Sequence, residues 1–131
     1  MTLVVSNVGD VLALNRLLNV ASTADVVCHL FSNSYSPQKT DTVSSYTECS
    51  AAGYAAITCT GASWVVATVS SVTTASYPAI TFNFTGAQTV YGYYITDSAG
   101  TTLLLAEAFP TALAIPSGGG SVTVTLNITA N

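Results

Sequence analysis

The sequence predicts a mainly β fold: an antiparallel β-sandwich or jelly-roll-like barrel of about eight strands, with one N-terminal α-helix. Two observations carry this prediction. After residue 25, apolar runs follow one another at spacings of about eight to twelve residues, with turn residues between them. Before residue 25, apolar residues recur at helical spacing instead. With 131 residues, we expect a single domain over 1–131, with the helix at about 8–21 and the sandwich at about 25–129.

The helix is expected over residues 8–21 because apolar side chains recur there at three- and four-residue spacing. These residues are Val8, Val11, Leu12, Leu14, Leu17, Leu18 and Ala21. Asn7 or Asp10 is a suitable cap for its first turn. The apolar stripe is wide, which favours a helix packed against a sheet or against a neighbouring subunit.

The first strands follow this helix. Residues 25–31 are apolar on both faces, which is typical of a central strand. Residues 32–45 are polar and contain a proline, so we expect a loop there. Residues 54–60 and 64–69 have strand patterns, and Gly61-Ala62 divides them.

The second half contains the clearest strand signals. Residues 79–84 alternate strictly, with apolar side chains on one face, as in a half-buried strand. Residues 90–96 and 101–109 form a predicted hairpin around Asp97-Ser98-Ala99-Gly100, where aspartate at the start and glycine at the end fit a type I turn. We expect Pro110 to end the returning strand.

The last strand is expected over residues 122–128, where apolar residues alternate again. Pro116 and Gly118-Gly119-Gly120 supply the turn before it. The chain shows no internal repeat and no sign of a second domain.

Positive charge is almost absent. Arg16 and Lys39 are the only basic residues, against six acidic ones, and the formal net charge is -4. Charged residues make up 6% of the chain, where about a quarter is usual. A chain so poor in charge is expected to hide much of its surface against copies of itself or other proteins. The acidic balance argues against nucleic-acid binding, which needs clustered Lys and Arg, and against electrostatic attachment to anionic membranes.

Targeting signals are not evident in the sequence. No apolar run reaches the about 20 residues that a membrane-spanning helix needs. Met1 to Val5 lack the basic and apolar regions of a secretory signal. We therefore expect a protein that begins at this methionine, is made in a cytosol and has no membrane partner.

Residues with catalytic or ligand-binding chemistry are few. The cysteines, Cys28, Cys49 and Cys59, are odd in number, so we expect buried thiols and leave open a Cys49–Cys59 bridge. His29 lies in an apolar run without a nucleophile motif, which favours a core or interface histidine over a catalytic base. Glu48 and Glu107 are the only conceivable glycosidase pair, and no cleft pattern supports them. No zinc-like ligand spacing occurs. We expect no enzyme, no cofactor and no metal.

Several segments stand out as an ordered set. They are Leu14-Asn15-Arg16-Leu17-Leu18, Leu30-Phe31-Ser32-Asn33, Ser36-Pro37, Tyr46-Thr47-Glu48, Gly53-Tyr54-Ala55, Trp64, Tyr77 to Phe82, Val90 to Asp97 and Leu105 to Phe109. Together they resemble a family of small virion proteins of tailed bacteriophages over nearly the whole chain. One departure is visible between Leu105 and Phe109, where a Trp-Ala-Glu-Arg-Phe-like stretch is usual in that family. The arginine beside Glu107 is missing here.

This resemblance implies a structural protein of a virion that is assembled in the host cytoplasm. A capsid decoration (cement) protein fits best, because it needs apolar and aromatic subunit contacts and no chemistry. We expect a homotrimer that contacts the major capsid protein or other virion subunits. Candidate interface residues are Leu12, Leu14, Arg16, Leu17, Leu18, Tyr91, Tyr93 and Glu107.

Two alternatives stay open. The first is a tail tube, tail-tip or fibre-attachment subunit, which copy number per particle distinguishes from a cement protein. The second is a glycan-binding β-sandwich module, in which Trp64, Tyr91 and Tyr93 stack on sugars.

Overall fold

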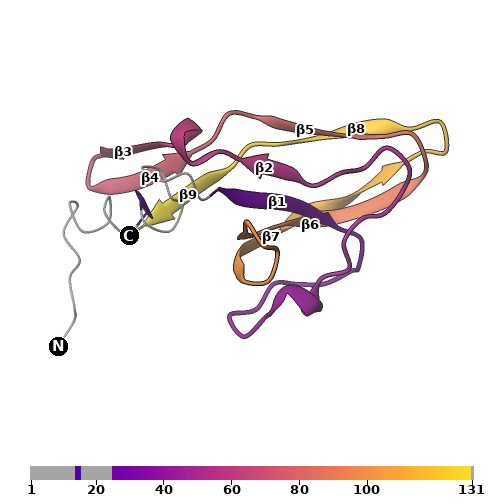
Figure 1. The fold of residues 1–131 in the computed structure, drawn as a ribbon, viewed down its shortest axis with the longest axis horizontal. Coiled ribbons are helices and arrows are strands. Elements are labelled where there is room, and N and C mark those ends of the chain that lie inside the picture. The colour runs from indigo at the N-terminus through magenta and orange to yellow at the C-terminus, as the bar shows by residue number, and fades with distance from the viewer. Residues whose placement is uncertain (1–13, 16–24, 131) are drawn as a thin grey trace.

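The computed structural model describes residues 14–15 and 25–130, and strands dominate this part of the chain (Figure 1). The strands are β1 (Val26–Phe31), β2 (Ile57–Cys59), β3 (Val65–Val69), β4 (Val72–Ser76), β5 (Ile80–Phe84), β6 (Gln88–Asp97), β7 (Leu103–Ile115), β8 (Gly120–Val124) and β9 (Asn127–Ala130). Two short 3-10 helices, η1 (Val43–Ser45) and η2 (Gly61–Ser63), lie in the connections. The helix predicted over residues 8–21 lies outside the described residues, apart from Leu14 and Asn15.

The strands form three open sheets with the orders β2–β1–β6–β7, β3–β4–β9 and β5–β8. Every pairing between these strands is antiparallel. Within the described ranges no sheet closes into a barrel, and no helix is long and apolar enough to cross a membrane. Figure 1 shows the β3–β4 hairpin at one end of an elongated molecule and the turn between β7 and β8 at the other. The prediction of a mainly β, antiparallel fold is confirmed.

One apolar core is shared by the three sheets. It gathers Val26, Cys28 and Leu30 of β1, Ala75 of β4, Phe82 and Phe84 of β5, Val90 and Ile95 of β6, and Val122 and Val124 of β8. The alternation predicted for β5 is confirmed, because every second residue from Ile80 to Phe84 is buried while Thr81 and Asn83 are exposed. The core therefore draws on strands that are distant in the sequence.

The opposite face of the β2–β1–β6–β7 sheet is covered by the loop between β1 and β2. A second apolar cluster forms there from Phe31, Tyr46 and Tyr94, and Tyr46 belongs to the loop. β1 lies between β2 and β6, so the predicted central strand is confirmed. The predicted loop is confirmed as well, since residues 32–45 contain no strand.

The hairpin predicted around residues 97–100 is also confirmed. The N–H of Gly100 donates to the carbonyl of Asp97 at 3.0 Å, and Gly100 has a φ of 73°. The Asp97 carboxylate accepts the N–H groups of Thr101 at 2.9 Å and Thr102 at 3.1 Å. These bonds fix the turn that joins β6 to β7.

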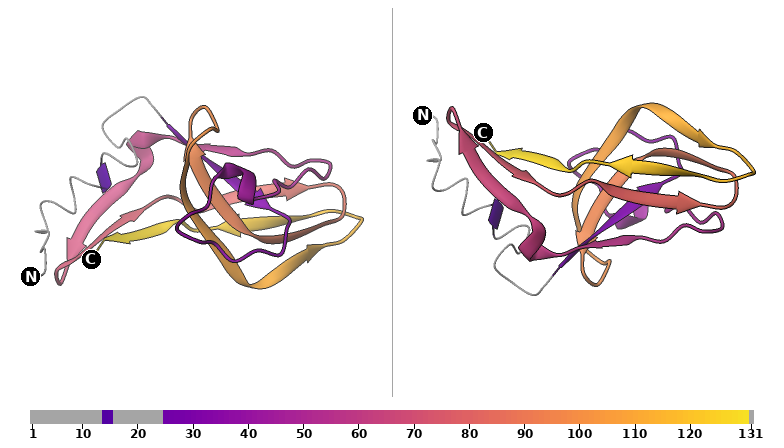
Figure 2. Two further views of the ribbon diagram at one scale, coloured as in Figure 1. Left: turned by 90° about the horizontal axis from the view of Figure 1, so that it is seen from below. Right: turned by 90° about the horizontal axis from the view of Figure 1, so that it is seen from above.

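The prediction that Pro110 ends a strand is wrong. β7 continues to Ile115, and its register against β6 shifts so that residues 109–112 face Tyr91 alone. A bulge of this kind leaves residues without ladder hydrogen bonds, so a proline is tolerated in it. Figure 2 shows the bend that β7 makes along its length.

Two further features were not predicted. β4 (Val72–Ser76) pairs with both β3 and β9 and is central in its sheet. The strand predicted over residues 122–128 is divided, because β8 pairs with β5 while β9 pairs with β4. Leu126 lies between the two halves and is fully buried.

Candidate interaction surfaces

The structure brings together two of the predicted interface residues, Tyr93 and Glu107. They are direct partners across the β6–β7 ladder, and the Tyr93 hydroxyl donates to Oε2 of Glu107. Burial, followed by this carboxylate, raises the pKa of Tyr93 above its ordinary value. Together with Ile95, Leu105 and Ile128, they line a hollow of about 250 Å³ between β7 and β9.

The predicted interface residues are not exposed as a group. Leu14 and Tyr93 are buried in the main core, so neither offers its side chain to a partner. Tyr91 is half-buried, and it lines a hollow with Tyr35 and Pro110. The remaining members lie outside the described residues; they are Leu12, Arg16, Leu17 and Leu18.

Asp41 organises the loop that covers the outer face of the sheet. Its carboxylate accepts hydrogen bonds from the Tyr35 hydroxyl, the Tyr46 hydroxyl and the N–H of Gln38, each at 2.7 Å. Desolvation raises the pKa of Asp41, but the three hydrogen bonds outweigh it, and the pKa is lower than usual. The two tyrosine rings also meet edge to face, with centroids 5.7 Å apart. The loop is therefore held by a carboxylate whose bonds are already made.

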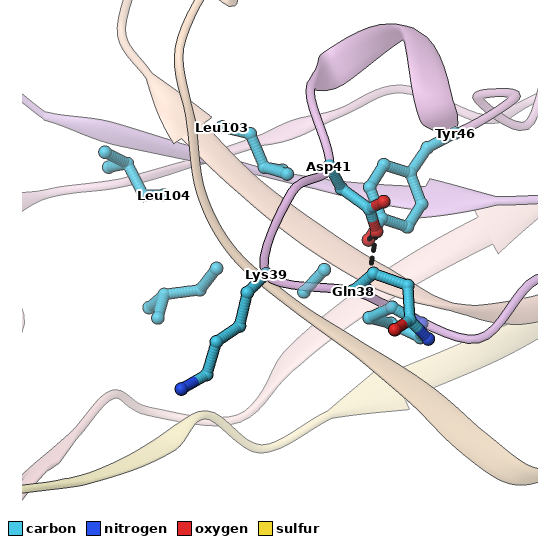
Figure 3. A pocket seen from close by; sticks show the side chains of 9 residues that line it. Gln38, Lys39, Asp41, Tyr46, Leu103 and Leu104 are labelled. Carbon is cyan, nitrogen blue, oxygen red and sulfur yellow. Dashed lines mark hydrogen bonds between the residues drawn. The ribbon is translucent and has the colours of Figure 1, made fainter.

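A wider hollow of about 540 Å³ lies between this loop and β7 (Figure 3). Its lining includes Lys39, Asp41, Tyr46 and residues 103–106. Lys39 is the only basic residue in the described part of the chain and makes no ion pair there. The hollow therefore offers one free ammonium group, while its carboxylate is already engaged by the loop.

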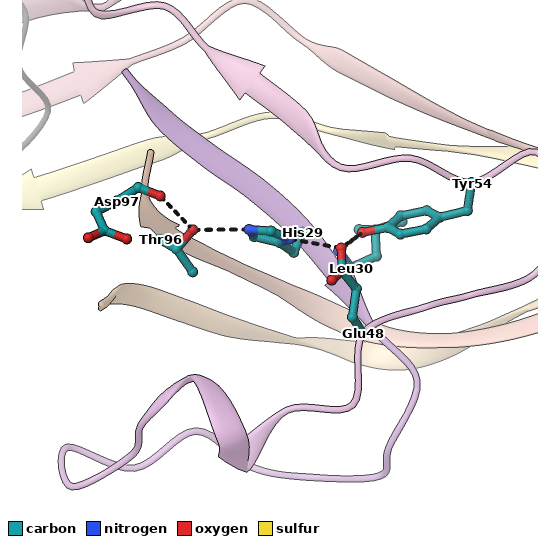
Figure 4. A network of polar contacts seen from close by, with 6 residues as sticks. All are labelled: His29, Leu30, Glu48, Tyr54, Thr96 and Asp97. Atoms are coloured by element: carbon teal, nitrogen blue, oxygen red, sulfur yellow. Dashed lines mark hydrogen bonds and ion pairs between the residues drawn. The ribbon is translucent and has the colours of Figure 1, made fainter. Parts of the chain in front are cut away.

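His29 is the centre of a polar network on the outer face of the sheet (Figure 4). Its Nδ1 lies 2.8 Å from Oε1 of Glu48, and its Nε2 lies 3.0 Å from the Thr96 hydroxyl. The imidazole stacks on the Tyr94 ring, with centroids 4.7 Å apart and planes inclined by 10°. Glu48 belongs to the covering loop, so this network ties the loop to β1 and β6.

Two further hydroxyl contacts belong to this network. The Thr96 hydroxyl also lies within hydrogen-bond distance of the Asp97 carbonyl, to which it can donate at 2.9 Å. The Glu48 carboxylate accepts the Tyr54 hydroxyl proton at 2.9 Å and accepts from Nδ1 as well. The network therefore joins the covering loop, β1 and β6 through the side chains of Glu48, His29 and Thr96.

This geometry supports neither a catalytic base at His29 nor a glycosidase pair of Glu48 and Glu107. Thr96 is fully buried, and none of the three hollows described here is lined by His29. Glu48 lies with His29 and Tyr94 on one face of the sheet. Glu107 bonds to Tyr93, whose side chain points to the opposite face because neighbouring residues of a strand alternate. The two glutamates are thus not brought together as a glycosidase pair would be.

The acidic side chains of the described residues all accept hydrogen bonds from the chain itself. The hydrogen bonds of Asp41, Glu48, Asp97 and Glu107 are given above. The Asp25 carboxylate accepts the N–H of Gly61 at 3.0 Å. In residues 14–15 and 25–130, no group of three or more His, Cys, Asp or Glu side chains is arranged to hold a metal ion. The carboxylates therefore position loops and turns.

The three cysteines are free and buried, which confirms the prediction of buried thiols. Burial raises the pKa of Cys49 to about 12 and that of Cys59 to about 11. The pKa of Cys28 is raised as well, first by burial and then by the neighbouring Cys59. Such thiols are poor nucleophiles at neutral pH.

The β3–β4–β9 sheet has a different surface. None of its residues is charged, because the described charged residues lie in other strands and loops. Val65 is 61%, Val69 72% and Val72 41% exposed, and these valines belong to β3 and β4. Sequence reasoning missed β4, although the Val- and Thr-rich run on both sides of Ser70-Ser71 is a hairpin signal.

The aromatic residues considered for sugar stacking do not form an exposed platform. Trp64 is buried and packs on Tyr77, with ring centroids 5.0 Å apart. Tyr93 is buried and Tyr91 is half-buried. These rings contribute to the interior of the protein and not to a shared open surface.

Comparison with known proteins gives no relatives for this chain: no protein-family model, no curated protein and no solved structure matches it.

Proposed function

We propose that this protein is a structural subunit of a tailed-bacteriophage virion: a capsid decoration (cement) protein, without enzymatic activity, that stabilises the head shell. In this proposal it forms a homotrimer and contacts the major capsid protein. The ordered sequence segments that resemble small virion proteins suggest the setting. A tail tube, tail-tip or fibre-attachment subunit is the alternative within the same class.

The observation that carries the proposal is the uncharged β3–β4–β9 sheet with its exposed valines. Val65 and Val69 are among the most exposed large apolar residues of the described chain. Interfaces between subunits are depleted in charge and enriched in apolar contacts at their centre. The carboxylates, which an enzyme would need free, are engaged in turns and loops instead.

The proposed function goes with a proposed arrangement of two of the sheets. We propose that the β5–β8 ribbon and the β2–β1–β6–β7 sheet are the two layers of a β-sandwich. Phe82 of β5, Val122 of β8 and Leu30 of β1 are all buried in the one core, which supports the assignment. Such a layered body would give a cement protein rigid edges on which to present contact surfaces.

Cryo-electron microscopy of intact particles tests the function directly. The expected result is density for this chain at regular positions over the head, in hundreds of copies per particle. Quantitative mass spectrometry of purified particles supplies an independent copy number. Density confined to the tail, with a few copies per particle, would replace the cement proposal by the tail alternative. Absence of the chain from purified particles would refute both.

A further inference from the structure

β3 (Val65–Val69) is an open sheet edge. In the described part of the chain it pairs with β4 and with no other strand. Natural proteins usually protect such edges with lysine, proline, a bulge or an inward charge. β3 has none of these residues, and its register with β4 continues without a shift from Val65 opposite Ser76 to Val69 opposite Val72. No strand among residues 25–130 therefore pairs with the outer edge of β3.

The turn of this hairpin determines which backbone groups face the open side. Ser70 and Ser71 have φ values of 50° and 64°, as a two-residue type I′ turn requires. In such a hairpin the pair that flanks the turn exchanges hydrogen bonds, and every second pair does so after it. The backbone groups of Val69 and of alternate residues back to Val65 therefore face β4. Those of Val66 and Thr68 face the open edge.

Charge favours a second copy of this chain as the occupant of that edge. The whole chain has a formal net charge of -4, so two copies repel each other where their acidic loops approach. The stretch from residue 49 to residue 96 carries no charge, and it contains both β3 and β4. The β3 edge is thus a place where two copies can meet without like charges in contact.

We propose that two copies of the chain pair through β3, antiparallel, across a two-fold axis that passes beside Ala67. In this register Val66 and the partner's Thr68 exchange hydrogen bonds through the groups that face the open edge. Val65 then lies opposite the partner's Val69 on the exposed face. The contact uses the same patch on both copies, as a two-fold interface must.

The role of this contact in a virion rests on the proposed function. An icosahedral shell contains two-fold as well as three-fold axes, so trimers at neighbouring three-fold positions are related by two-folds. A β3–β3 contact would join such trimers into a network. In solution the same contact doubles the mass of the species that the chain otherwise forms.

Two charge variants test the register. Val65→Lys with Val69→Lys places like charges opposite each other, and Val65→Lys with Val69→Glu places opposite charges there. Sedimentation at increasing concentration should show mass doubling for the wild type and for the Lys/Glu variant, with about tenfold weaker association for the Lys/Lys variant. Equal association in all three proteins, or equal loss in both variants, would overturn the register. Both sites are more than half exposed, so the fold tolerates the changes.

A cysteine trap tests the contact itself. In the proposed register Ala67 faces its own copy as a non-hydrogen-bonded pair, with Cα atoms about 4.5 Å apart, which suits a disulfide. Ala67→Cys should give at least about tenfold more disulfide-linked dimer than the exposed control Ala99→Cys, because pairing raises the effective thiol concentration. Equal yields from the two variants in the purified protein would overturn the proposal.

The Ala67→Cys variant, assembled into particles, distinguishes a failure of the proposed β3 contact from a failure of the proposed cement function. A cross-linked product with twice the mass of this chain supports the β3 contact, whereas a product with the major capsid protein would overturn it. The proposed function fails on a different result, which is the absence of the chain from heads.

Discussion

Replacing Gly92 with alanine tests how closely β1, β6 and β7 approach one another. Gly92 lies in β6 and pairs with Phe31 of β1 and Ala108 of β7. A Cβ atom there would lie 2.2 Å from the carbonyl oxygen of Glu107 and 2.7 Å from two atoms of the Phe31 ring. Ordinary contacts between heavy atoms are about 3.5 Å, so a backbone strand or a fully buried ring must move.

The expected cost follows from this crowding. Overpacking of a rigid core costs about 1–3 kcal/mol, and a clash with a backbone oxygen belongs at the upper end of that range. The reduced entropy of the unfolded alanine chain offsets about 0.4–1 kcal/mol. We therefore expect Gly92→Ala to lower the free energy of unfolding by about 2 kcal/mol.

Urea titration followed by tryptophan fluorescence measures this change, because Trp64 is the only tryptophan and is buried. Gly118→Ala is the matched control, since no atom lies within 4 Å of its added Cβ and its φ is not positive. The control should change the free energy of unfolding by less than about 0.5 kcal/mol. If Gly92→Ala were as mild as Gly118→Ala, the close approach of the three strands would be refuted.

Three further predictions concern the polar groups. Thr96→Val should lower the free energy of unfolding by about 1–3 kcal/mol, because it removes a buried hydroxyl that bonds to the His29 ring and to the Asp97 carbonyl. The exposed control Thr81→Val should cost less than about 0.5 kcal/mol. The lowered pKa of Asp41 stabilises the folded protein above about pH 4 and the effect is lost as pH falls, so Asp41→Asn should show a shallower acid decline of thermal stability than the wild type. An aromatic disulfide reagent at neutral pH should label none of the three cysteines in the folded protein and all of them in denaturant, and rapid labelling without denaturant would contradict their burial.

Local chemistry made part of the fold predictable. The alternation at residues 80–84 requires only that one face be buried, and the structure buries that face. The turn at residues 97–100 is specified by an aspartate that accepts N–H groups and a glycine at positive φ. Both signals are contained within a few residues, so no knowledge of distant partners was needed to interpret them.

The wrong or missing predictions depend on partners that are distant in the sequence. Pro110 is tolerated because β7 bulges against Tyr91, and that register depends on where β6 lies. The division of residues 122–128 depends on β5 and β4, which pair with its two halves separately. An alternating pattern shows which face is buried, but it does not show which strand will pair with it.

The candidate interface residues were likewise predictable only in part, because their exposure depends on residues distant in the sequence. Sequence reasoning selected Tyr93 and Glu107, and the structure pairs them, but it buries Tyr93 against the core. Aromatic side chains in a strand pattern suit a core and an interface equally, because both bury apolar area. The exposed valines of β3 were not singled out, since exposure depends on the absence of a covering strand.

Scarcity of charge takes a more specific meaning once the residues are placed. The carboxylates of Asp25, Asp41, Glu48, Asp97 and Glu107 each accept hydrogen bonds from groups of the same chain. In the described residues the carboxylates therefore fix loops and turns around the β2–β1–β6–β7 sheet. Among the described residues, the β3–β4–β9 sheet has only neutral side chains, and β3 is one of its edges. Because no charged residue lies in this sheet, the proposed pairing between copies would depend on backbone hydrogen bonds and apolar contact, and salt would have little to screen there.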